Sequence, residues 1–225
     1  MHLSTIGQLS LSLSLALYLI YFLPQIWYNQ KTGNARSVSP WLQLIYVLGY
    51  STDWLYGAAA QLQWQYRCVT LIGILALCFQ QWQMRPTSEA HQLNHGKLLR
   101  NYRFNTTVVV LMILSALTFS HFVTPGKTRS INSLGTMTML CSILAFAPQL
   151  IRNYKNKNGL AISHVFIAIT LICAVLDLVS AVCLDWPWPS LVSPPALFTI
   201  NLSCWLQQRR YRRREANFIR PLSIT

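Results

Sequence analysis

Charged residues are scarce in this sequence. Only 10% of its 225 residues are Asp, Glu, Lys or Arg, five of these are acidic, and hydrophobic residues make up 53%. A soluble domain of this size would need a far larger charged surface, so the composition is typical of a membrane protein. The net charge of +13 comes without a recognisable nucleic-acid motif, so nucleic acid is not an expected partner.

Catalytic and metal-binding motifs are also missing from the sequence. It contains no nucleophile elbow, phosphate-binding loop or metal-ligand spacing, so we predict no enzyme activity, no catalytic residue, no cofactor and no metal site. The six cysteines form no close CxxC pair, which argues against both a zinc site and a disulfide framework.

Long apolar stretches recur along the whole chain. Each is about 18 to 24 residues long, enough for a helix to cross a hydrocarbon core of roughly 30 Å. The sequence therefore predicts an all-α integral membrane protein with seven transmembrane helices. The seven stretches are 9–28, 41–60, 66–82, 104–122, 131–151, 160–184 and 188–206.

An internal repeat organises these stretches. Residues 24–39 and 148–163 align without a gap and share six of sixteen positions. The identical pairs are Pro24/Pro148, Gln25/Gln149, Asn29/Asn153, Lys31/Lys155, Asn34/Asn158 and Ser39/Ser163. The same offset of 124 residues places Asp53 on Asp177, and these are the two acids that lie inside apolar stretches.

The repeat predicts two similar three-helix bundles with the same membrane orientation. The fourth span has no counterpart, so it is expected to be a connector helix between them, giving a 3+1+3 order. We therefore divide the chain into a first repeat, a linker with the connector helix, a second repeat and a basic tail. Their expected ranges are 1–84, 85–125, 126–207 and 208–225.

The basic residues predict the orientation of the chain. Fifteen of the 18 Lys and Arg residues lie in the connections on one side or in the tail, and three lie on the other side, at Arg67, Lys127 and Arg129. By the positive-inside rule, both repeated loops and the C-terminus are expected in the cytoplasm and the N-terminus outside.

Asp53 and Asp177 are the strongest candidates for a functional site. A carboxylate near the bilayer centre costs several kcal/mol, so such residues usually face the protein interior and are used. Tyr46 and Tyr50 share the face of Asp53 at helical spacing and would line the same cleft. Burial disfavours the charged form, so one of the pair is expected to change protonation near neutral pH. A proton site, a cation site and a structural carboxylate pair all remain open.

Pro24 and Pro148 should kink their helices, because proline removes a backbone hydrogen bond and clashes with the preceding turn. Gln25 and Gln149 could bind the freed carbonyls or the opposite bundle. The kinks could serve as hinges or be static.

The two Pro-Gln pairs, each followed by an Asn and a basic residue within seven spans, resemble the PQ-loop repeat family, which includes cystinosin, the lysosomal cationic amino acid exporters and the related SWEET sugar carriers. The resemblance implies a small carrier with its substrate between two bundles and the motif prolines as hinges. Asn201 resembles the cleft asparagine of sugar-carrying relatives, although its counterpart at the repeat offset, Leu77, is apolar.

We therefore expect a proton-coupled carrier of small polar solutes, preferably cationic amino acids or cystine, working by alternating access. A facilitative sugar carrier and a receptor that binds a ligand without moving it, as the KDEL receptors do, are the alternatives. Protons, the solute and membrane lipids are the expected partners, and one chain could hold the full path as a monomer. A bacterial inner membrane is favoured, with a lysosome-like organelle as the second option.

Overall fold

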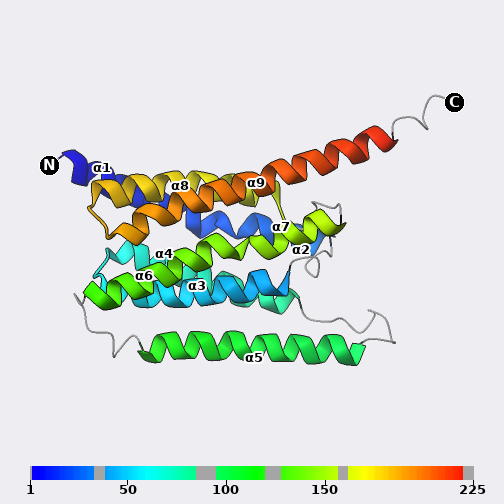
Figure 1. The fold of residues 1–225 in the computed structure, drawn as a ribbon, viewed down its shortest axis with the longest axis horizontal. Coiled ribbons are helices and arrows are strands. Elements are labelled where there is room, and N and C mark those ends of the chain that lie inside the picture. The colour runs from blue at the N-terminus through cyan, green and yellow to red at the C-terminus, as the bar shows by residue number, and fades with distance from the viewer. Residues whose placement is uncertain (1, 33–38, 85–94, 120–127, 157–161, 220–225) are drawn as a thin grey trace.

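The computed structural model describes residues 2–32, 39–84, 95–119, 128–156 and 162–219. All regular structure in these ranges is α-helical, which confirms the all-α fold class. The helices are α1 (His2–Tyr21), α2 (Leu23–Thr32), α3 (Pro40–Ala59), α4 (Trp64–Gln83), α5 (His95–Phe119), α6 (Thr128–Ala145), α7 (Ala147–Asn156), α8 (His164–Cys183) and α9 (Trp188–Ile219) (Figure 1).

The two predicted proline kinks are real breaks in the helices. Phe22 separates α1 from α2, and Phe146, which follows it by 124 residues, separates α6 from α7. Pro24 and Pro148 each stand at the second position of the helix that follows the break. Proline is tolerated there because that backbone N–H would have no helical acceptor.

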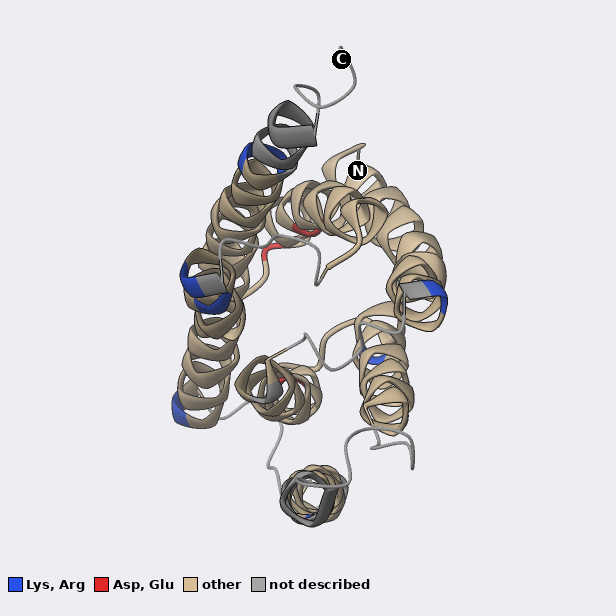
Figure 2. Cartoon of the chain, turned by 90° about the vertical axis from the view of Figure 1, so that its right-hand side faces the viewer, with Lys and Arg blue, Asp and Glu red and all other residues tan. Residues whose placement is uncertain are grey.

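Six helical rods form a closed ring. The broken helices α1–α2 and α6–α7 each count as one rod, and the other four rods are α3, α4, α8 and α9. In the first half α4 lies between α1 and α3, and in the second half α9 lies between α6 and α8 in the same way. The ring closes through the pairs α1–α8 and α3–α6, which are equivalent under the repeat, whereas α5 packs outside the ring against α3 (Figure 2).

The repeat extends to the turns between helices. Gln61 after α3 and Asp185 after α8, again 124 residues apart, have φ of 51° and 53°, the left-handed region that L-residues rarely adopt. In both turns the next backbone N–H, of Leu62 or Trp186, bonds a carbonyl in the last turn of the preceding helix at 3.0 Å. Such a left-handed residue is a common way to end a helix.

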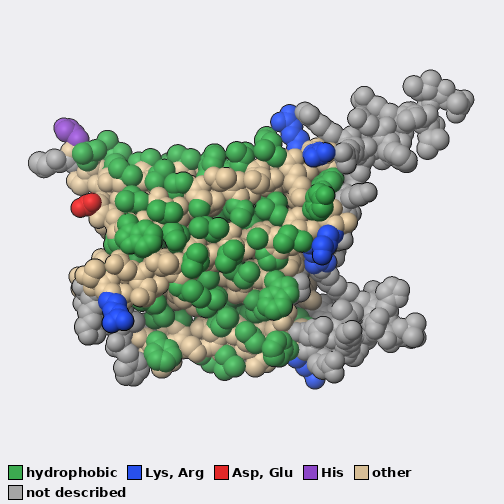
Figure 3. Space-filling view, viewed as in Figure 1, with side chains coloured by type: hydrophobic (Ala, Val, Ile, Leu, Met, Phe, Trp, Pro, Cys, Tyr) green, Lys and Arg blue, Asp and Glu red, His purple; other side chains and the backbone are tan. Residues whose placement is uncertain are grey.

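The outer surface is apolar. Hydrophobic side chains cover the sides of the ring, and basic side chains gather near its ends (Figure 3). Among the described residues, three segments are long and apolar enough to span a membrane: His2–Lys31, Thr128–Lys155 and His164–Cys183. The other helices carry more polar side chains, such as Gln43 and Asp53 in α3, so the seven-span arrangement remains a prediction.

Two helices extend further than their apolar stretches predicted. The helix α5 begins at His95 rather than near residue 104, and α9 continues to Ile219 rather than ending near residue 206. The α5 extension contains Lys, Leu and Arg and the α9 extension contains Gln, Arg, Glu and Ala, all of which are good helix formers. Apolarity marks the part of a helix that suits a membrane, but it does not mark the end of the helix.

Candidate functional site: a carboxylate cavity inside the helix ring

A cavity of about 130 Å³ lies inside the ring, with lining residues from all six of its rods. Both Asp53 and Asp177 line it, as the sequence predicted, and so do Tyr46 and Tyr50. The wall is unusually aromatic. Its aromatic members are Tyr18, Tyr21, Tyr46, Tyr50, Tyr56, Tyr66 and Trp186.

Asp53 is held from within its own repeat. Its carboxylate accepts hydrogen bonds from the hydroxyls of Tyr66 and, at 2.9 Å, of Thr70. Tyr66 and Thr70 are one turn apart on α4, so their hydroxyls reach the same side of α3. Because α3 and α4 belong to the same half of the ring, these bonds fix the position of Asp53 inside that half.

Asp177 is held from the other repeat. Its two oxygens accept from Ser14 at 2.5 Å and from Tyr18 at 3.0 Å, and both donors lie on α1. The carboxylate on α8 therefore forms a polar contact across the junction between the two halves of the ring. The adjacent Ser10 adds a bond from its hydroxyl to the Leu176 carbonyl at 2.8 Å.

Basic side chains are missing from the described lining of this cavity. Every polar partner of the two carboxylates in the described residues is a hydroxyl group. Hydroxyl donors do not neutralise a carboxylate, so a proton or a bound cation would have to do so. The surrounding aromatic rings favour a cation as well, because the face of a ring attracts positive charge. The arrangement can therefore bind protons, small cations or both.

The end of the ring beside the two Pro-Gln pairs is closed by hydrogen bonds between the repeats. Gln25 Oε1 accepts from the backbone N–H of Ser163 at 2.8 Å, and Gln149 Oε1 accepts from the backbone N–H of Ser39 at 2.9 Å. We call these two contacts the cross-repeat hydrogen bonds. The sequence left open whether these glutamines bind the carbonyls freed by the prolines or the opposite bundle. The cross-repeat hydrogen bonds are contacts with the opposite half of the ring.

A layer of aromatic side chains separates the cavity from these glutamines. Tyr21 and Phe22 pack against Phe166 with ring centroids 4.6 and 5.8 Å apart, and Phe146 packs edge-on against Tyr46. All but Tyr46 are at most 7% exposed. A void of only about 20 Å³, lined by Phe22 and Gln25 among others, lies beyond the layer. The path toward the Pro-Gln end is therefore blocked in this conformation.

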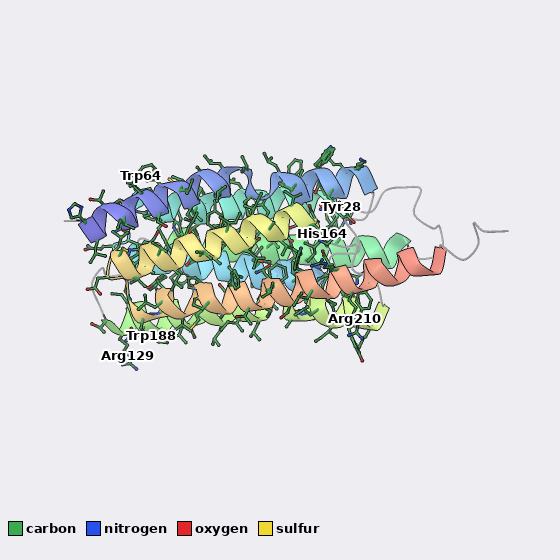
Figure 4. The ribbon with its side chains drawn as sticks, turned by 90° about the horizontal axis from the view of Figure 1, so that it is seen from above. Tyr28, Trp64, Arg129, His164, Trp188 and Arg210 are labelled. Atoms are coloured by element: carbon green, nitrogen blue, oxygen red, sulfur yellow. The ribbon has the colours of Figure 1, made fainter. Side chains whose placement is uncertain are left out.

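The opposite end of the ring has different contacts between the halves. Tyr56 shares a hydrogen bond with Ser190 at 2.8 Å, and Trp186 Nε1 donates to Gln63 at 2.9 Å. Trp64 and Trp188 lie at this end, whereas His164 lies near the Pro-Gln end (Figure 4). Exposed tryptophans at the end of a helix bundle are typical of a membrane interface.

The model of the PQ loop repeat matches residues 6–66 and 131–190, which together make up more than half of the chain. The chain belongs to the PQ-loop repeat family. Its helices are accordingly those of a membrane protein, and its place in the family favours transport or ligand reception over catalysis. Comparison with curated proteins and with solved structures gave no match.

The PQ motifs, Pro24-Gln25 and Pro148-Gln149, lie at the two helix breaks, so the family repeat and the structural repeat coincide. Asn201 lies elsewhere. It is fully buried in α9, donates to the Leu197 carbonyl at 2.8 Å and does not line the cavity.

Sequence reasoning missed the four hydroxyl donors that hold the carboxylates. Ser14 and Tyr18 lie one turn apart on α1, and the Tyr66–Thr70 pair has the same spacing on α4. This regular spacing of polar residues inside apolar helices was the available signal. It could not show which carboxylate each pair would reach.

Proposed function

We propose that this protein is a proton-coupled carrier of small polar solutes, with cationic amino acids or cystine preferred. The observation that carries the proposal is the cavity itself: two carboxylates, bound only by hydroxyls among the described residues, share one aromatic wall without a basic side chain. A neutral sugar needs hydrogen bonds and stacking but no charge, so this cavity favours a cation over a sugar.

The transport path requires the ring to span the membrane. We propose that the rods α1–α2, α3 and α4 form one bundle within residues 1–84 and that α6–α7, α8 and α9 form the other within 126–207, with α5 as the connector in 85–125. The equivalent helix contacts of the two halves support this 3+1+3 division. The basic tail 208–225 and both PQ motifs would then face the cytoplasm, and the N-terminus would face outward.

Alternating access follows from the two sets of contacts between the halves. Opening the cytoplasmic side would break the cross-repeat hydrogen bonds and part the aromatic layer, with bending at Pro24 and Pro148. Opening the other side would break the contacts of Tyr56 and Trp186. A carrier needs only one set to be broken at a time, and in the observed state both sets are formed.

Protonation of Asp177 is the step that we assign to coupling. An ionised carboxylate only accepts hydrogen bonds, whereas a protonated one can also donate. A change of protonation therefore alters the bonds from Ser14 and Tyr18, which join α8 to α1 across the repeats. Asp53, held within one repeat, would instead bind the cationic group of the solute. Transport is coupled only if the proton affinity differs between the two states.

The experiment measures uptake by proteoliposomes under an imposed pH gradient, with arginine, lysine, cystine, neutral amino acids and sugars as candidate solutes. The parent protein is expected to accumulate a cationic solute on the alkaline side, as a proton symporter would. Asp53→Asn and Asp177→Asn are expected to abolish this accumulation. Asp185→Asn is the matched control, because Asp185 is exposed in the α8–α9 turn and should leave uptake unchanged.

Two outcomes would overturn the proposal. If sugars equilibrate without dependence on pH and both Asn variants behave like the parent, the protein is a facilitative sugar carrier. If a ligand binds saturably but never crosses the membrane, it is a receptor. Reconstitution at one chain per vesicle would test whether a monomer suffices, and expression in bacteria and in cultured cells would test the proposed bacterial inner membrane against a lysosome-like organelle.

A further inference from the structure

A second pair of glutamines, outside the PQ motif, occupies equivalent positions in the two repeats. Gln83 and Gln207 are 124 residues apart, in the C-terminal parts of the α4 and α9 rods. Each donates its Nε2 hydrogen to a backbone carbonyl two residues after a motif proline, Gln83 to Ile26 and Gln207 to Leu150, both at 3.1 Å. The two PQ helices are thus held in the same way by the third rod of their own half.

In the first repeat this contact completes a continuous hydrogen-bond chain. The backbone N–H of Ser163 donates to Gln25, Gln25 Nε2 donates to Asn29 Oδ1 at 2.8 Å, and Asn29 Nδ2 donates to Gln83 Oε1 at 3.2 Å. The last link is from Gln83 to the Ile26 carbonyl. The chain therefore joins the start of α8, in the second repeat, to the end of α4.

The direction of this chain is fixed at both ends. A backbone N–H can only donate and a backbone carbonyl can only accept, so the three amide side chains have a single consistent orientation. If Gln83 loses its amide, the buried Asn29 loses the acceptor for its Nδ2 group, and only the Ser163 end of the chain still fixes the orientation of Gln25 and Asn29. The chain thus gives Gln83 an effect on Gln25 without direct contact between them.

In the second repeat the equivalent chain is open at one link. Ser39 donates to Gln149, and Gln149 Nε2 donates to Asn153 Oδ1 at 2.8 Å. The Asn153 Nδ2 group and Gln207 Oε1, however, are both buried and have no hydrogen-bond partner among the described residues. The homologous atoms of Asn29 and Gln83 are bonded, so the two repeats differ at this one link.

We propose that Gln83 is a positioning residue of the first PQ motif, which holds the hydrogen bond between Gln25 and Ser163 in place, and that Gln207 lacks this role in the observed conformation. The inference rests on the proposed function in one respect, namely that the cross-repeat hydrogen bonds close the cytoplasmic side. Gln83 contacts neither the cavity nor the carboxylates.

The test is hydrogen–deuterium exchange of the full-length protein in nanodiscs, read in peptides that contain the amides of Ser163 and Ser39. Gln83→Met keeps the size and helix preference of the side chain but removes its amide. It is expected to speed exchange of the Ser163 amide about fivefold, as the weakening of one hydrogen bond would. Gln207→Met is expected to leave the Ser39 amide within twofold of the parent.

Gln81→Met is the matched control on the same helix. Gln81 also has an amide side chain and is 4% exposed. It donates to Thr106 of α5 at 3.0 Å and takes no part in the hydrogen-bond chain from Ser163 to Ile26. It should leave the Ser163 amide within twofold of the parent. If it accelerates Ser163 as much as Gln83→Met does, or if Gln207→Met accelerates Ser39 equally, the effect is general loosening and the inference is overturned.

This measurement needs no solute, so its result is independent of the transport assay. A protein that moves no solute but shows the specific acceleration at Ser163 would refute the proposed function and retain the positioning role. A protein that transports normally but shows no acceleration would refute the positioning role alone.

Discussion

The backbone N–H of Ser163 donates to Oε1 of Gln25 at 2.8 Å, although 138 residues separate them. In the equivalent bond, Ser39 of the first repeat donates to Gln149 of the second repeat. Ser39 and Ser163 each cap the start of a helix without a hydrogen bond from their own side chain. A motif glutamine therefore supplies, from the opposite repeat, an acceptor for a buried backbone group that would otherwise lack one.

We predict that Gln25→Leu and Gln149→Leu will each lower the free energy of unfolding by about 1 to 3 kcal/mol, because each leaves a buried backbone N–H without an acceptor. Denaturation of the purified protein in detergent measures this change. Gln30→Leu, on the exposed face of α2, is the control and should stay within about 0.5 kcal/mol of the parent. Equal losses in all three variants would contradict a specific role for the motif glutamines.

The offset of 124 residues predicted much of the backbone. It places the helix breaks at Phe22 and Phe146 and also the left-handed turn residues Gln61 and Asp185, which were not singled out in the sequence. Backbone geometry repeats because it depends mainly on local sequence and on helix contacts that are equivalent in the two halves.

The partners of the carboxylates could not be predicted in this way. Asp53 is bound by Tyr66 and Thr70, and the residues 124 positions later are Ser190 and Pro194. Proline has no donor, and Ser190 bonds Tyr56 instead. Asp177 therefore takes its donors from α1, a helix that becomes its neighbour only through closure of the ring.

We predict that Asn201→Leu will be tolerated. Asn201 is fully buried, its Oδ1 has no partner among the described residues, and the equivalent residue of the first repeat is already Leu77. Removing an unsatisfied buried acceptor should leave the free energy of unfolding unchanged or raise it by about 1 kcal/mol. Thermal denaturation and uptake assays measure the two effects.

Asn201→Asp is the contrasting variant, since a buried charge should cost several kcal/mol. A tenfold loss of solute affinity in Asn201→Leu, with unchanged stability, would instead assign Asn201 to the solute path, as the resemblance to sugar carriers implies.

We predict that Gln61→Gly will stabilise the protein by about 0.5 to 1 kcal/mol. Gln61 is exposed and has a φ of 51°, which costs an L-residue about 1 to 2 kcal/mol and glycine very little. Asp185→Gly should gain less, because Asp tolerates this region better than Gln does. Ala60→Gly, at a φ of −84°, should destabilise, and a gain there would show that the left-handed geometry is not the cause.

Gly73 packs directly against the ring of Tyr50, a residue that lines the cavity. A Cβ atom at this position would lie 2.3 Å from Cε1 of the Tyr50 ring, which lines the cavity and stacks on Tyr46 with centroids 6.1 Å apart. We predict that Gly73→Ala will displace this ring, lower the free energy of unfolding by about 1 to 3 kcal/mol and weaken solute binding about tenfold or more. Denaturation and binding of the transported solute measure the two effects.

Two further variants separate displacement of the Tyr50 ring from the general effect of adding a Cβ atom at a packed helical glycine. Gly57→Ala brings its new Cβ only to 3.2 Å from the Tyr66 ring, so the helix preference of alanine should offset most of the crowding and leave stability nearly unchanged. Adding Tyr50→Leu to Gly73→Ala removes the clashing ring, so stability should recover while solute binding stays weak. Recovery of both would mean that the Tyr50 ring takes no part in binding, and recovery of neither would mean that Gly73 acts through another contact.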